Sequence, residues 1–190
     1  AKQNRIAKTE GYEKESAQEE LRSWQVRWAS HLLRTKQFAA VAELIASLPP
    51  ETRTAEAAAL VPLDLQAAAQ LNTLDARIAG YRAGPQSAPA SEVLRATARQ
   101  LFAAGDKQAA RKVLEFVFAR EIDEHKLAAA NFLGLAEIRI AAGDMPGALD
   151  WLRRLVIAVG GPFENLDPAA GLLEKTGHSA EAVEFLAQLV

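Results

Sequence analysis

Apolar residues recur at intervals of three and four over most of the chain, the spacing of one face of an α-helix. The clearest case is residues 135–155, where two such stripes flank a short polar turn. In that turn Gly143 suits the left-handed residue that ends a helix, Asp144 suits the N-cap of the next helix, and Pro146 suits its first turn. The pattern predicts a helical hairpin whose inner ends are both specified by the sequence.

The same pattern recurs along the chain. Equivalent turns are predicted at Lys36, Leu71, Gly105 and Gly177, so that successive turns lie 34 to 38 residues apart. Seven residues before the turns stand Ala29, Asp64, Ala98, Ala136 and Ala170, and five after them stand Val41, Ala76, Ala110, Ala148 and Ala182. Small residues at these positions allow the two helices of a hairpin to approach closely. The recurrence predicts five hairpins in register.

A small residue, a Gly-Asp turn, an alanine and then a bulky apolar residue, at a period near 34 residues, resembles the tetratricopeptide repeat. The first two repeats lack the turn glycine, and leucine mostly replaces the family's aromatic residues, so the chain resembles a divergent member. The resemblance implies an all-α fold, a right-handed α-solenoid or α-α superhelix of about five hairpins. Residues 16–190 then form one repeat domain, with approximate repeats 16–50, 51–85, 86–123, 124–161 and 162–190.

Several segments carry more local expectations. Residues 1–15 have few apolar side chains and mixed charge, so they are either frayed or an exposed helix start, and we expect weak order there. Trp24 and Trp28 lie one turn apart on one helix face, which favours core residues over a ligand-stacking platform.

Two prolines predict helix boundaries. Pro62 predicts a kink, or a helix that ends near Leu60 and restarts at Pro62. Residues 160–163 read as a turn, and Asp167 with Pro168 reads as a helix cap followed by a first-turn proline.

Composition removes several classes of function. The net charge is −2 and the pI about 6.0, so the chain lacks the basic stripe of a nucleic-acid-binding protein. It has no cysteine, and therefore no disulfide and no thiolate chemistry. No apolar run approaches the roughly 20 residues of a membrane span, so membrane insertion is not expected. The compartment stays open, with a slight preference for the cytoplasm over an extracytoplasmic location.

The sequence predicts no catalytic, metal or cofactor site, and so not an enzyme. It has no phosphate-binding glycine loop, nucleophile elbow or zinc-protease motif. Glu121 and His125 stand four residues apart on an expected helix, where a solvated ion pair is favoured over metal ligation because the other ligands are lacking.

The tetratricopeptide resemblance implies instead a concave groove lined by the first helix of each hairpin. The groove residues it implies are Arg27, Arg34, Leu65, Arg95, Arg99, Phe102, Leu133, Glu137 and Ile140. The apolar members would anchor a protein or peptide segment while the arginines pair with its carboxylates. The family's carboxylate clamp is absent, since Ser30, Leu65, Arg99, Glu137 and Gly171 stand where its asparagines would be.

These features favour a non-enzymatic scaffold that binds a segment of another protein. The alternative is an accessory repeat domain of a larger enzyme or of a transport or secretion assembly, which positions a module outside these residues. The chain closes on residues 182–190, which are apolar on more than one face. A solenoid end needs a polar outer face, so we also expect a covering helix in a longer parent chain, or weak self-association through Phe185 to Val190.

Overall fold

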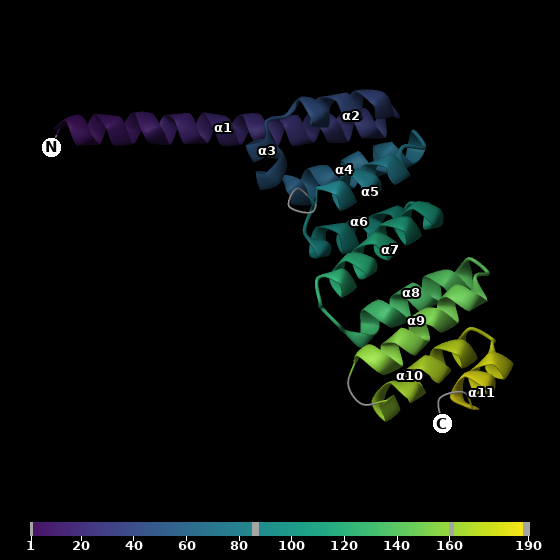
Figure 1. Ribbon diagram of the computed structural model, residues 1–190. Coiled ribbons are helices and arrows are strands. Elements are labelled where there is room, and N and C mark those ends of the chain that lie inside the picture. Colours follow the sequence, from purple (N-terminus) through teal and green to yellow (C-terminus); the bar gives the residue numbers. More distant parts are fainter. Residues whose placement is uncertain (1, 85–87, 160–161, 188–190) are drawn as a thin grey trace. The chain divides into compact units, whose positions relative to one another are not determined.

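The computed structural model describes the backbone of residues 2–84, 88–159 and 162–187, and the side chains of 16–84, 88–159 and 164–187. Every regular element in these ranges is an α-helix, eleven in all, and none is a strand (Figure 1). The all-α prediction is therefore confirmed. The chain divides into two compact units, residues 1–109 and 110–190.

The first unit is built around α4. It contains α1 (Lys2–Arg34), α2 (Phe38–Ser47), α3 (Pro50–Ala55), α4 (Ala57–Gln70), α5 (Leu74–Ala83), α6 (Ser91–Ala103) and the start of α7 (Lys107–Asp123). Helix α4 packs against α1, α2, α3, α5 and α6, while α1 also packs against α2. One apolar cluster of this unit consists of Ala29, Leu32, Val41, Ile45, Leu48, Leu60 and Ala67.

The second unit contains most of α7, then α8 (Ala129–Ala141), α9 (Met145–Ala158), α10 (Pro162–Lys175) and α11 (Ser179–Ala187). Helix α8 packs against α9, and α10 packs against α8, α9 and α11. The core includes Phe132, Leu152, Leu155, Leu173 and Phe185. Within each unit the first helix of a hairpin, α4 or α10, packs on its hairpin mate and on both helices of the preceding hairpin.

The five predicted turns share one backbone geometry. Lys36, Asn72, Gly105, Gly143 and Gly177 all have positive φ, between 58° and 90°. At Gly143 the turn residue donates its N–H to the Ile140 carbonyl and Asp144 donates to the Arg139 carbonyl, both at 2.9 Å, and the other four turns repeat these bonds. This is the left-handed motif that satisfies the last carbonyls of a helix. The second turn residue is Asn72, one position after the predicted Leu71.

The predicted aspartate cap is confirmed. The Asp144 carboxylate Oδ1 accepts a hydrogen bond from the backbone N–H of Gly147 at 3.0 Å, and Pro146 lies in the first turn of α9. Asp106 caps α7 in the same way, with Oδ1 3.0 Å from the N–H of Ala109. Each aspartate satisfies an amide that the new helix leaves without a partner.

The prediction of a helix break at Pro62 was wrong. Helix α4 runs through Pro62, and the break lies six residues earlier at Glu56, where φ is −101° and ψ is 18°. Leu60, Val61 and Pro62 are all buried, so packing on both sides of α4 outweighs the hydrogen bond that the proline lacks. The break separates the short helix α3 and gives eleven helices rather than ten.

The predicted cap at Asp167 and Pro168 was also wrong, because α10 begins at Pro162 and continues through both residues. Pro162 takes the first-turn position instead, where a missing N–H costs little. The Asn165 side chain donates to the carbonyl of Val159, which ties the start of α10 to the end of α9. Of the predicted turn at 160–163, residues 160 and 161 lie outside the described ranges.

Residues 2–15 are the start of a long helix, since α1 begins at Lys2 (Figure 1). The weak order expected of them stays a prediction. No helix in the described ranges is both long and apolar enough to cross a membrane.

Candidate partner-binding surfaces

Three candidate groove residues lie on one face of α6. Arg95, Arg99 and Phe102 follow the i, i+4, i+7 spacing of a helix face. The Phe102 side chain is 60% exposed, a large fraction for an apolar ring. The Lys107 ammonium lies 5.7 Å from the centroid of this ring. Arg99 is exposed and forms no ion pair with a described carboxylate, whereas Arg95 is half-buried. This face combines an accessible aromatic ring with a cation one turn away.

Leu65 does not belong to such a surface, because its side chain is 0% exposed in the core of the first unit. The sequence analysis placed Leu65 in the groove by its distance from a turn at Leu71, but the left-handed turn residue is Asn72. Counting back from Asn72 instead selects Gln66 in place of Leu65, and Gln66 is partly exposed. The error is one of register within a single repeat.

In the second unit the candidate residues are divided between surface and core. Glu137 is exposed on α8. Leu133 and Ile140 are only half-buried and pack against the apolar core of the unit. These two side chains offer part of their surface to a ligand while they also support the hairpin.

The two remaining candidates, Arg27 and Arg34, are exposed on α1. Beside them lie Trp24 and Trp28, which are 54% and 42% exposed, so the prediction that both are core residues was wrong. Their rings stack with centroids 6.0 Å apart and an interplanar angle of 8°. His31 extends the stack, with its ring centroid 5.3 Å from that of Trp28. Sequence reasoning missed this surface because it assigned every apolar stripe to a core.

A buried polar group lies in α4. The Asp64 carboxylate Oδ1 lies 2.9 Å from an Nη of Arg77 on α5. Burial raises the pKa of Asp64, and the neighbouring Arg77 and Arg53 charges oppose that rise. Burial, followed by the Asp64 charge, raises the pKa of Tyr81 well above its usual range. Because these groups pair within one unit, the cluster serves packing between α4 and α5.

Tyr81 is expected to ionise later than an ordinary tyrosine. A raised folded-state pKa contributes stability that is complete below the unfolded value of about 10 and is lost as pH rises beyond it. An ultraviolet absorbance titration of the chain should show a tyrosine that ionises only above the usual pH range. Tyr81→Phe should remove this late step. A titration without a late step, or a late step that persists in Tyr81→Phe, would contradict the burial of Tyr81.

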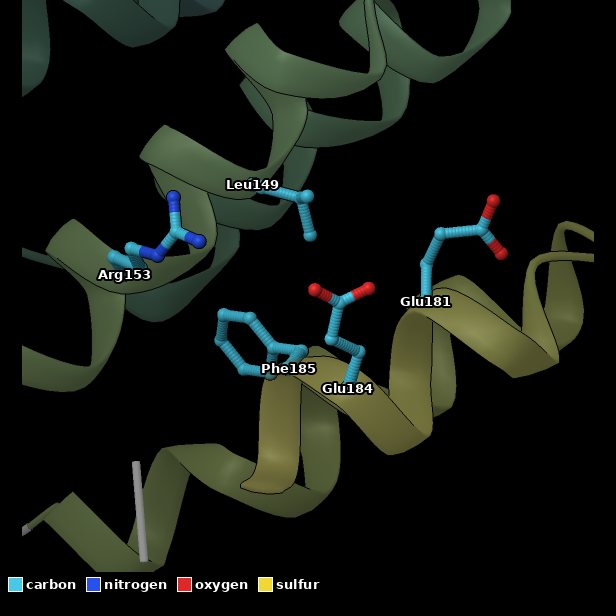
Figure 2. A pocket seen from close by; sticks show the side chains of 5 residues that line it. All are labelled: Leu149, Arg153, Glu181, Glu184 and Phe185. Atoms are coloured by element: carbon cyan, nitrogen blue, oxygen red, sulfur yellow. The ribbon is translucent and has the colours of Figure 1, made fainter. Parts of the chain in front are cut away.

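A small pocket lies between α9 and α11, with a volume of about 50 Å³. Figure 2 shows Leu149 and Arg153 on one side of it and Glu181, Glu184 and Phe185 on the other. Its volume suits one or two water molecules rather than a cofactor, because small-molecule sites usually measure roughly 300 Å³ or more. It offers no site for an organic ligand.

Metal ligation finds no support in the described side chains, among which no three His, Asp or Glu residues converge. Glu121 and His125 were expected on one helix face, but α7 ends at Asp123 and His125 has a φ of 59° in the following turn. The expectation of a helical i, i+4 pair was therefore wrong.

Searches with family models, curated proteins and solved structures as references found no match to this chain. Function must therefore be inferred from the chain's own surfaces.

Proposed function

We propose that the chain is a tetratricopeptide-like scaffold: a right-handed α-solenoid of five hairpins that binds a segment of another protein and catalyses no reaction. Support comes from the five left-handed turns with identical hydrogen bonds. Further support comes from the packing order inside each unit, where α4 packs on α1 and α2, and α10 packs on α8 and α9. Contacts between successive first helices are the contacts that a stack of hairpins requires.

The binding face proposed for the first unit is that of α6, and the observation that carries it is the 60% exposure of Phe102. When a partner's apolar side chain covers an exposed aromatic ring, the burial of both apolar surfaces stabilises the complex. Arg99, one turn earlier, is available to pair with a carboxylate of the same partner. The expected ligand is a peptide segment with an apolar residue close to an aspartate or glutamate.

A peptide-display library selected on the full chain tests this proposal. Selected peptides should combine an apolar side chain with nearby acidic residues. Phe102→Ala and Arg99→Glu should each weaken their binding roughly tenfold or more, since central aromatic and arginine contacts dominate such interfaces.

The matched control is Ile157→Ala, which removes an exposed apolar side chain from α9 in the other unit. It should leave the affinity of the selected peptides unchanged. Equal losses for Ile157→Ala and Phe102→Ala, or selection of no peptide at all, would contradict a specific α6 site.

A further inference from the structure

Helix α1 carries an exposed apolar stripe that nothing in its own unit covers. Ala17, Leu21, Trp24, Trp28 and His31 are separated by four, three, four and three residues, which is the spacing of a coiled-coil seam. All five are exposed, and Leu21 and Trp24 are each 54% exposed. The buried face of α1 lies elsewhere, on Ala29 and Leu32.

The corresponding face of the next hairpin is buried. Lys36 and Asn72, the left-handed turn residues, are 36 positions apart, so Trp24 and His31 of α1 correspond to Leu60 and Ala67 of α4. Those two α4 residues lie in the same apolar cluster as Val41 and Ile45 of the first hairpin. Trp24 and His31 of the stripe therefore occupy positions by which α4 packs on the hairpin before it. On α1 this stacking face is open.

The stripe is self-complementary when two copies of α1 run antiparallel. A two-fold axis beside residues 22 and 23 sets Leu21 against Trp24 of the second copy and Ala17 against Trp28. Each layer then pairs a smaller residue with a larger one, which is how helical seams fill space.

The charges on the flank of the stripe fit the same arrangement. Glu20 and Arg27 are seven residues apart on one flank, both are exposed, and neither forms an ion pair with a described side chain. The axis that pairs Leu21 with Trp24 also places Glu20 of each copy beside Arg27 of the other. In a parallel pair, by contrast, equal residues of the two copies would lie level and this match would be lost.

The packing of α1 leaves room for this partner helix. Residues 16–20 of α1 are exposed throughout, whereas α2 and α4 cover its C-terminal part (Figure 1). Antiparallel pairing lays the uncovered part of each helix along the covered part of the other, so the two bodies lie toward opposite ends of the pair.

We propose that the face of α1 formed by Ala17, Leu21, Trp24 and Trp28 binds the same face of a second copy in an antiparallel helix pair, with Glu20 and Arg27 setting its register. This surface uses α1 alone and is independent of the peptide binding proposed for α6.

Analytical ultracentrifugation of the full chain over a concentration series tests the pairing, with circular dichroism as the check on folding. The chain should show a monomer–dimer equilibrium. Leu21→Glu should weaken it about tenfold or more, because a carboxylate would enter the apolar seam beside Trp24 of the other copy. The control Val183→Glu alters a residue that is 68% exposed on α11 and should leave the equilibrium unchanged.

Charge exchange between Glu20 and Arg27, which flank the apolar stripe, supplies a second and more specific test. Glu20→Arg and Arg27→Glu, each alone, place like charges together twice per dimer and should weaken it several-fold. An equimolar mixture of the two variants restores both pairs, so a heterodimer as tight as the wild-type dimer should form. A strictly monomeric wild-type chain would overturn the proposal. So would a dimer sensitive to Val183→Glu but not to Leu21→Glu, or a mixture that shows no rescue.

Discussion

Arg77→Ala should destabilise the first unit by about 3 kcal/mol, the cost of leaving a buried carboxylate without its counter-charge. The Asp64 side chain is 7% exposed and that of Arg77 is 39% exposed. Water can therefore solvate Arg77 when its partner is removed, but it cannot solvate Asp64 to the same extent. Without Arg77, the buried Asp64 anion keeps only the Arg53 charge beside it, or it takes up a proton. The free energy of unfolding from urea titration at neutral pH measures the loss.

Substitution of the other member of the ion pair supplies the control. Asp64→Ala removes the buried carboxylate, and Arg77, whose side chain is 39% exposed, can then be hydrated. It should be near neutral, because burial already raises the pKa of Asp64 and so disfavours its charged form. The cost of Arg77→Ala should also shrink as pH falls, because burial raises the pKa of Asp64 and a protonated Asp64 needs no counter-charge. Equal costs for the two substitutions at neutral pH would contradict this asymmetry.

Ala148→Leu should destabilise the second unit by roughly 1 to 3 kcal/mol, because three more carbon atoms must enter a closely packed core. Ala148 is fully buried and lies in one apolar cluster with Phe132, Leu152 and Phe185. Thermal or urea unfolding measures the loss. Ala158→Leu, an exposed position at the end of the same helix, is the matched control and should be near neutral. Similar effects at both positions would show that the predicted repeat register is wrong.

The hairpin turns could be predicted because their signals are local. A glycine that ends one helix and an aspartate that caps the next determine the turn at Gly143 within a few residues of chain. Pro62 and Pro168 were misjudged because the local penalty of a proline competes with the packing of a whole helix, which is not visible within a short window. The turn at Asn72 was placed one residue early because asparagine gives a weaker left-handed signal than glycine.

The candidate surfaces were less predictable than the turns. Apolar periodicity identifies a face that avoids water, but it does not say whether the chain itself covers that face. Trp24 and Trp28 follow the spacing of core residues, yet no described helix covers them and both are exposed. Phe102 is exposed, as its predicted position requires, because the Gly105 turn fixes the register of α6, and its role in a groove stays a prediction.

Self-association was predicted for residues 185–190 and is now better supported on α1. Phe185 is buried in the core of the second unit and is therefore not available for a contact between copies. Residues 188–190 lie outside the described ranges. Val183 on α11 remains an exposed apolar side chain, and for that reason it serves as the control for the α1 interface.

Distance measurement between spin labels on the first helices tests the proposed continuous stack most directly. The chain has no cysteine, so Arg99→Cys, Glu137→Cys and Gly171→Cys can be combined in labelled pairs without background. Positions 137 and 171 lie on α8 and α10, which pack together, and their separation calibrates one step between neighbouring first helices. A continuous stack predicts a similar short and narrow distance between 99 and 137, with axes roughly 10 Å apart. A much longer or broad distance between 99 and 137, beside a short one between 137 and 171, would contradict the solenoid.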